Sequence, residues 1–138
     1  MTRDPGPAVA RAARALVGTP FRLHGRDPRS GLDCIGLVAA ALEGAGLPAD
    51  PPAGYGLRNA DPCDPDAVAR RSALHPASGP PRPGDVVIVR PGPGQLHLLV
   101  CAGADGFIHA HAGLRRVVAM PGPLPWPVLG RWRPGGKD

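Results

Sequence analysis

The sequence predicts an α+β fold in which N-terminal helices pack on an antiparallel sheet. Apolar residues recur at helical spacing in two segments before Gly46. From Pro83 onward, short apolar runs alternate with turns rich in glycine and proline, which is typical of consecutive antiparallel strands. The chain has 138 residues and no internal repeat or linker, so we expect a single domain, residues 1–138, with a core over roughly residues 8–133.

The first helix is predicted over residues 8–17. Pro7 suits the first helical position, and Gly18 is typical of the position after a helix end. A turn then leads into a short extended piece, residues 21–23. The polar residues 24–31 are expected to form a loop that delivers the chain to the second helix.

The second helix, residues 34–45, begins with a cysteine. Asp33 is the expected N-cap, because its carboxylate can accept a hydrogen bond from a free N–H of the first turn. These N–H groups and the helix dipole favour an anion, so they lower the pKa of the Cys34 thiol and make it a candidate nucleophile. The spacing from Cys34 to Leu37 and Val38 places the thiol on the apolar face. An unreactive buried cysteine is therefore the alternative.

Residues 48–82 are interrupted by prolines and show little periodicity, although residues 64–72 could form a short capped helix. The only tyrosine of the chain, Tyr55, lies in this insert. A long insert between core elements often carries substrate contacts, but it can equally be a solvated loop. The sequence leaves both interpretations open.

The second half of the chain is expected to form the sheet. Residues 103–106 have the composition of a hairpin turn between two apolar runs. The predicted strands are residues 85–90, 95–102, 107–111, 115–120 and 128–133.

Charge and cysteine content exclude several classes of function. The net charge of +5 would attract an anionic partner, but the arginines are scattered and not interleaved with aromatic residues, so no nucleic acid is expected. The three cysteines form no CxxC pair, and we expect neither a metal nor another cofactor. No apolar run could span a membrane, and residues 1–17 lack the apolar segment of a secretory signal. We therefore expect synthesis in the cytoplasm without a signal peptide and no membrane partner.

Two histidines lie on neighbouring predicted strands. His97 is set in an apolar run, and His109 follows twelve residues later, across the predicted hairpin turn. An even separation places both rings on one face of the sheet if the hairpin loop has an odd number of residues. A thiol at a helix start, a base on a strand and a second polar group that orients the base match the logic of thiol catalysis. A hydrogen-bonded core histidine is the alternative for His97 alone.

Together, these segments resemble the NlpC-type cell-wall cysteine peptidases. The resemblance extends from about residue 8 to 133, and its order and gaps are specific although each motif alone would be weak. The segments that carry it are Gly18-Thr19-Pro20-Phe21-Arg22, Asp33-Cys34-Ile35-Gly36-Leu37-Val38, Pro83-Gly84-Asp85-Val86-Val87 and His97 with Phe107-Ile108-His109-Ala110.

The resemblance implies a papain-like fold and a Cys-His-His triad. By it, Cys34 is the nucleophile, His97 the general base and His109 the residue that orients His97. The implied substrate is the peptide stem of peptidoglycan, commonly cleaved between D-γ-glutamate and the diamino acid. Phe21, Asp33 and Tyr55 are the residues we expect near the substrate.

The chain also departs from the family pattern. Phe21 stands where the family usually has a tyrosine that lines the site, and Ile35 replaces a common serine. The longer loop before Cys34 and the closing residues 129–133 most resemble the branch found in phage tails and gene-transfer particles. That branch implies phage-like tail-tip proteins as partners and action at the cell wall as part of a particle. It would also explain the missing signal peptide.

Two other functions remain open at this point. The chain could keep the fold as a weakly active or inactive structural protein of a tail or a wall-binding protein, which the loss of the tyrosine hydroxyl at Phe21 favours. It could also be an acyltransferase that uses the same thioester. The intact set of Cys34, His97 and His109 favours the peptidase.

Overall fold

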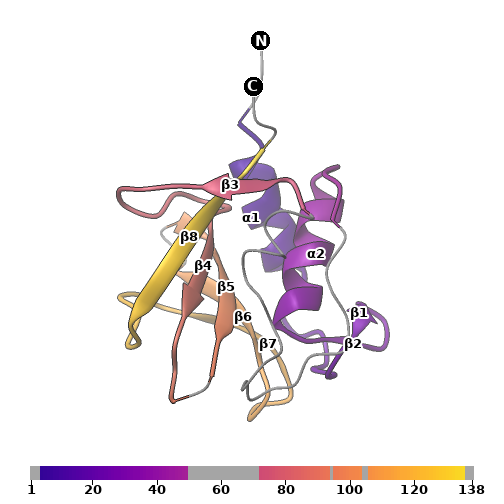
Figure 1. The fold of residues 1–138 in the computed structure, drawn as a ribbon. Coiled ribbons are helices and arrows are strands. Elements are labelled where there is room, and N and C mark those ends of the chain that lie inside the picture. The colour runs from indigo at the N-terminus through magenta and orange to yellow at the C-terminus, as the bar shows by residue number, and fades with distance from the viewer. Residues whose placement is uncertain (1–3, 50–71, 94, 104–105, 136–138) are drawn as a thin grey trace.

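The computed structural model describes residues 4–49, 72–93, 95–103 and 106–135, so Tyr55, Cys63 and most of the predicted helix 64–72 lie outside the described residues. It confirms the α+β fold, with helices before a mostly antiparallel sheet (Figure 1). The elements are α1 Gly6–Ala15, β1 Arg26–Asp27, β2 Gly31–Leu32, α2 Cys34–Gly44, β3 Leu74–Pro76, β4 Val86–Val89, β5 His97–Cys101, β6 Phe107–His111, β7 Arg116–Met120 and β8 Val128–Pro134.

Six strands form the main sheet in the order β3-β8-β4-β5-β6-β7, and all neighbouring strands are antiparallel. Both helices pack against one face of this sheet, as Figure 1 shows. The core on that side joins helix residues such as Val9 and Leu42 to strand residues such as Val100 and Ile108, all of them fully buried. This apolar layer holds the start of α2 against the sheet.

Strand alternation gives the opposite face of the sheet its own, smaller apolar cluster. It consists of Val87, Val89, Leu99, Cys101 and Phe107, with Trp126 packed against it. Cys101 is buried there, on the same face of β5 as His97, from which it is four residues away. We call these two sides the helix face and the open face of the sheet.

The structure contains three short strands that the sequence analysis did not predict. β1 and the first residue of β2 lie in residues 24–31, which were expected to be a loop, and β3 lies in the insert 48–82. Strands of two or three residues are too short to show a period-2 pattern, so their pairing partners decide them. The ends of α1 also differ from the prediction, since the helix begins at Gly6 and ends at Ala15.

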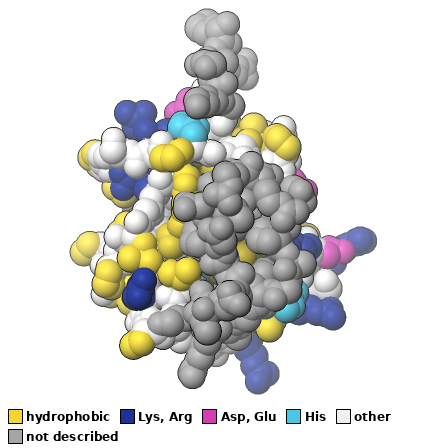
Figure 2. All heavy atoms as spheres, viewed as in Figure 1, with side chains coloured by type: hydrophobic (Ala, Val, Ile, Leu, Met, Phe, Trp, Pro, Cys, Tyr) yellow, Lys and Arg dark blue, Asp and Glu magenta, His cyan; other side chains and the backbone are white. Residues whose placement is uncertain are grey.

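Beyond β7 the sheet continues through the segment that follows α1. Pro20 pairs with Arg116 of β7, and Phe21 pairs with Leu32 of β2. The N–H of Phe21 donates to the Arg115 carbonyl at 2.9 Å. These residues therefore connect the sheet edge to the residues just before α2. In the space-filling view, Lys and Arg side chains stand at several separate places around the rim of the molecule, among them the side where β1 and β2 lie (Figure 2).

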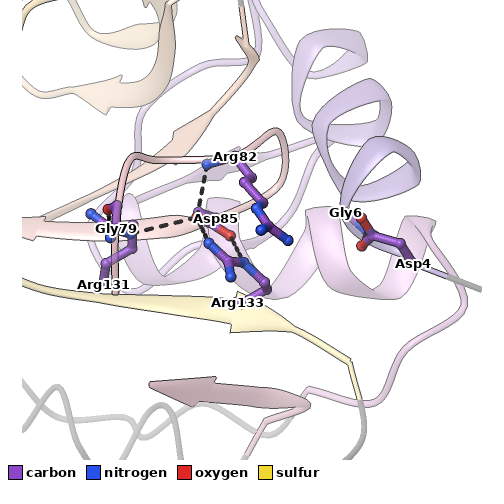
Figure 3. Close-up of polar contacts among 7 residues, drawn as sticks. All are labelled: Asp4, Gly6, Gly79, Arg82, Asp85, Arg131 and Arg133. Carbon is purple, nitrogen blue, oxygen red and sulfur yellow. Dashed lines mark hydrogen bonds and ion pairs between the residues drawn. The ribbon is translucent and has the colours of Figure 1, made fainter. Parts of the chain in front are cut away.

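A buried ion cluster ties the start of β4 to β8 (Figure 3). Asp85 is fully buried, and its two carboxylate oxygens accept hydrogen bonds from Nε and Nη2 of Arg133, each at 3.0 Å. The backbone N–H of Arg82 donates to the same carboxylate at 2.9 Å, and Arg131 lies 3.5 Å from it.

Neither helix of the described chain is long and apolar enough to cross a membrane.

Candidate active site

Cys34 is the first residue of α2, and the structure confirms Asp33 as the N-cap of this helix. The Asp33 carboxylate accepts a hydrogen bond from the Gly36 N–H at 2.8 Å. It also accepts one from the His24 N–H at 2.8 Å and one from the guanidinium of Arg26 at 3.1 Å. These contacts tie the preceding loop to the first helical turn and so orient Cys34.

Asp33 is only 1% exposed, and the hydrogen bonds just described occupy its two oxygens from inside the protein. The structure therefore gives this carboxylate an internal, positioning role. Its expected contact with substrate stays a prediction. Tyr55, the other expected substrate contact from the insert, lies outside the described residues.

The Cys34 side chain is partly buried and packs against the core of the helix face. Phe21 packs against the same core, beside Leu32. The first turn of α2 is also approached closely by another loop, since a Cβ at Gly36 would overlap the carbonyl oxygen of Gly25. The glycine of the Asp33–Gly36 motif is thus required by this close contact.

The structure brings His97 and His109 together. Pairing of Cys101 with Phe107 leaves a hairpin loop of odd length, which places both imidazoles on the open face as diagonal neighbours. His97 Nε2 and His109 Nδ1 lie 2.9 Å apart, within hydrogen-bond distance. The predicted proximity of the two rings is confirmed.

Burial holds both imidazoles in the neutral form. Desolvation, followed by the effects of the neighbouring His109 and His111, lowers the pKa of His97 from 6.5 to about 3. Desolvation, followed by the effect of His111, lowers the pKa of His109 to about 4. At neutral pH the pair therefore carries no charge and has one ring nitrogen free to accept a proton.

The His97–His109 contact also sets the tautomers that a proton-accepting His97 requires. If His97 Nε2 carries the proton and donates to His109 Nδ1, then His97 Nδ1 is the nitrogen with the free lone pair. His109 then carries its own proton on Nε2. A thiol on the Nδ1 side of His97 would meet a neutral acceptor in a fixed orientation.

Two aromatic residues that the sequence analysis did not assign to the site complete its surroundings. The Trp126 ring centroid lies 6.2 Å from each imidazole centroid, edge-on to both. His111, whose Nδ1 accepts a hydrogen bond from the Leu114 N–H, has its ring centroid 5.5 Å from that of His109. Trp126 lies in a proline-rich segment without periodicity, so only the path of the folded chain could reveal its place.

No group of three or more His, Cys, Asp or Glu side chains within the described residues is arranged to hold a metal ion. The chemistry that the arrangement offers is that of a helix-capped thiol and a neutral, oriented imidazole pair. Such groups suit nucleophilic acyl transfer at a carbonyl carbon.

Comparisons with known proteins identify the family of the chain. A family model described as the NlpC/P60 family matches residues 18–122, a span that includes Cys34, His97 and His109. No curated protein sequence matches the chain.

Solved structures with a similar fold have low sequence identity. NlpC2 from Trichomonas vaginalis is 18% identical, with a TM-score of 0.71, and the match covers 99% of this chain and 49% of that one. This chain thus spans about half the length of that protein. RipB, a peptidoglycan hydrolase from Mycobacterium tuberculosis, is 21% identical over 97% of this chain and 66% of its own, with a TM-score of 0.58.

The NlpC/p60 domain of the peptidoglycan hydrolase SagA is 25% identical, with a TM-score of 0.57. The match covers 84% of this chain and 88% of that domain, so the two are of similar extent.

Proposed function

The chain belongs to the NlpC/P60 family of peptidoglycan hydrolases, and we propose that it is a cysteine peptidase that cleaves the peptide stems of peptidoglycan. The observation that carries this proposal is the imidazole pair, in which buried His109 meets partly buried His97 and the atoms His97 Nε2 and His109 Nδ1 lie 2.9 Å apart. A histidine whose tautomer and orientation are fixed by a second histidine presents a free ring nitrogen that can accept a proton, as a general base must. The Asp33-capped helix start supports Cys34 as its partner nucleophile.

The proposed mechanism requires the Cys34 thiol, at the start of α2, to reach His97 at the first residue of β5. The thiol then gives its proton to His97 Nδ1, and its sulfur attacks the carbonyl carbon of the stem amide. The C–N bond then breaks, and the departing amine takes the proton from His97. A water molecule next attacks the thioester while His97 accepts its proton. The C–S bond then breaks to release the acid, and the proton returns from His97 to the sulfur, which restores the Cys34 thiol. His109 keeps His97 in the required tautomer through both steps.

Stabilisation of the tetrahedral intermediate falls to the backbone in this proposal. Phe21 has no hydroxyl group that could donate to the developing oxyanion. The N–H groups at the start of α2, including that of Cys34, are suited to this task because they carry the positive end of the helix dipole. Phe21 would then contribute an apolar wall beside the nucleophile.

The scissile bond we propose is the one between D-γ-glutamate and the diamino acid. We further propose that the chain works on a phage-like tail or gene-transfer particle, where tail-tip proteins would be its partners and the cell wall its place of action. The first proposal rests on the resemblance of the Asp33–Val38 and His97–His109 motifs to the family. The second rests on the loop before Cys34 and on the closing residues 129–133.

The test is digestion of purified sacculi of the diaminopimelate type by the wild-type chain and by Cys34→Ala, with fragments identified by mass spectrometry. We expect new stem-peptide fragments with the wild type only, and the masses of their ends name the bond. Fragments produced equally by Cys34→Ala would refute Cys34 as the nucleophile. No fragments from either protein would favour the structural tail or wall-binding function, for which the loss of the hydroxyl at Phe21 is the supporting observation.

A further inference from the structure

The sheet edge beside α2 presents an outward row of arginines. Pro20 and Arg116 pair across the edge, and Arg22 follows Pro20 by two residues in the extended segment that pairs with Leu32. Directly opposite and alternate residues share a face of a sheet, so Arg22 and Arg116 project to the same side. Both side chains are exposed, while Phe21 and Val117 on the other side pack into the core.

This outward side continues the open face that carries the imidazole pair. In the β6–β7 ladder His111 is opposite Arg116, and His109 is opposite Val118. Arg116 is therefore next to His111 on the face where His97 and His109 meet. A molecule bound at the histidines would extend along this face towards Arg116.

Arg115, which immediately precedes Arg116, has a backbone φ of 61°, in the left-handed region that favours glycine. It closes the turn after β6 and is exposed. A glycine or asparagine would fit this conformation more easily. Its exposed side chain adds a third positive charge beside that of Arg116.

Arg22, Arg115 and Arg116, which we call the cationic edge, have no carboxylate partner among the described residues. Four other arginines do pair with a carboxylate: Arg26 with Asp33, Arg29 with Asp27, and Arg131 and Arg133 with Asp85. Arg11, Arg82 and Arg90 have no such partner among the described residues either, so it is its position next to His111 that distinguishes the cationic edge. The charge of the cationic edge is therefore available to a bound anion.

We infer that the cationic edge is a binding subsite for the carboxylates of the stem peptide beyond the scissile bond. The inference rests on the proposed function and adds the part of the substrate that this site recognises. Stem peptides bear free carboxylates on γ-linked glutamate and on diaminopimelate. The planar guanidinium group matches a carboxylate with two parallel hydrogen bonds. The position of the edge next to His111 places this recognition within one peptide's length of the imidazole pair.

The test measures binding, so that it does not depend on turnover. The protein carries Cys34→Ala, and the probes are the tetrapeptide L-Ala-D-γ-Glu-diaminopimelate-D-Ala with free carboxylates and the same peptide with its glutamate and diaminopimelate carboxylates amidated. We expect the free-acid peptide to bind roughly tenfold more tightly than the amidated one, as charge-assisted hydrogen bonds would give. We expect Arg22→Gln with Arg116→Gln to abolish this preference.

The matched control removes two exposed arginines elsewhere, by Arg11→Gln with Arg90→Gln, which changes the net charge equally. It should retain the preference. If this control lost the preference for the free-acid peptide to the same extent, the effect would be one of net charge in general, and the inference would be overturned. Equal affinities for the two peptides in the Cys34→Ala protein, or tighter binding of a glycerol-phosphate polymer than of the free-acid peptide, would also overturn it.

Arg115→Gly gives a readout that a structural role would not produce. Glycine accepts the φ of 61° without strain, so thermal stability should be maintained or raised while the preference for the free-acid peptide falls. An unchanged preference would remove Arg115 from the subsite. If the wild-type chain cleaves stem peptides but binds the free-acid and amidated peptides equally well, the cationic edge is refuted and the proposed function stands. If the chain prefers the free-acid peptide but the wild type cleaves no stem peptide, the proposed function is refuted and the cationic edge stands as a binding site.

Discussion

At the scale of single residues, the imidazole pair makes stability depend on pH. His97 and His109 have pKa values lowered by burial to about 3 and about 4, whereas in the unfolded chain both titrate near 6.5. Between pH 6.5 and 4 the unfolded state therefore binds more protons than the folded state. The free energy of unfolding must fall as the pH decreases through this window, by up to about 1.4 kcal/mol per pH unit for each histidine.

His109→Gln tests this prediction. It removes one of the two groups that titrate differently in the folded and unfolded states. The slope of the free energy of unfolding against pH, between pH 6.5 and 4, should therefore fall by the equivalent of about one bound proton relative to the wild type. The measurement is chemical denaturation at several pH values. His24→Asn, which removes an exposed imidazole at a left-handed backbone position, is the control and should keep the wild-type slope. Equal slopes in His109→Gln and the wild type would contradict the prediction.

At the scale of elements, the start of α2 depends on the Asp33 carboxylate. Its removal in Asp33→Ala would leave the N–H groups of Gly36 and His24 and the guanidinium of Arg26 without this acceptor. Loss of a helix cap costs about 0.5–2 kcal/mol, and loss of one partner of a buried ion pair costs about 3–5 kcal/mol. We therefore expect a loss of at least about 2 kcal/mol in the free energy of unfolding, measured by urea denaturation.

The control at this position is Asp33→Asn, which keeps one acceptor oxygen for the Gly36 N–H but loses the charge that pairs with Arg26. Its free energy of unfolding should lie between those of the wild type and Asp33→Ala. A loss in Asp33→Ala within the few tenths of a kcal/mol typical of surface substitutions would show that the loop before Cys34 does not depend on this carboxylate.

At the scale of the whole molecule, the buried Asp85 cluster joins segments that are distant in the sequence. Asp85 stands directly before β4, while Arg131 and Arg133 are on β8, and Figure 3 shows all three side chains converging. Asp85→Ala would leave two arginines beside an apolar gap. We expect a loss of about 3–5 kcal/mol in the free energy of unfolding.

Asp27→Ala is the matched control for this substitution. It breaks the pair of Asp27 with Arg29 at 3.5 Å, in which both side chains are well exposed, so its effect should stay below about 1 kcal/mol. Denaturation curves of the two variants under identical conditions give the comparison. Similar losses in both would show that burial of the Asp85 cluster does not govern its contribution.

The sequence determined the parts of this protein that depend on local patterns. Helical spacing after Asp33, the capping carboxylate and the alternating runs after Pro83 predict the second helix, the main antiparallel strands and the α+β class, all of which the structure contains. The even separation of His97 and His109 also sufficed to place two rings on one face, because alternation along a strand is a local property.

Tertiary structure alone decided the remaining features, because each depends on contacts between distant segments. β1, β2 and β3 are too short to have a pattern and exist only through their partners. Trp126 reaches the imidazoles from a proline-rich segment, and Arg116 joins their face through its register with His111 and Pro20. The lowered pKa values of the two histidines likewise follow from burial, which only the packed molecule provides.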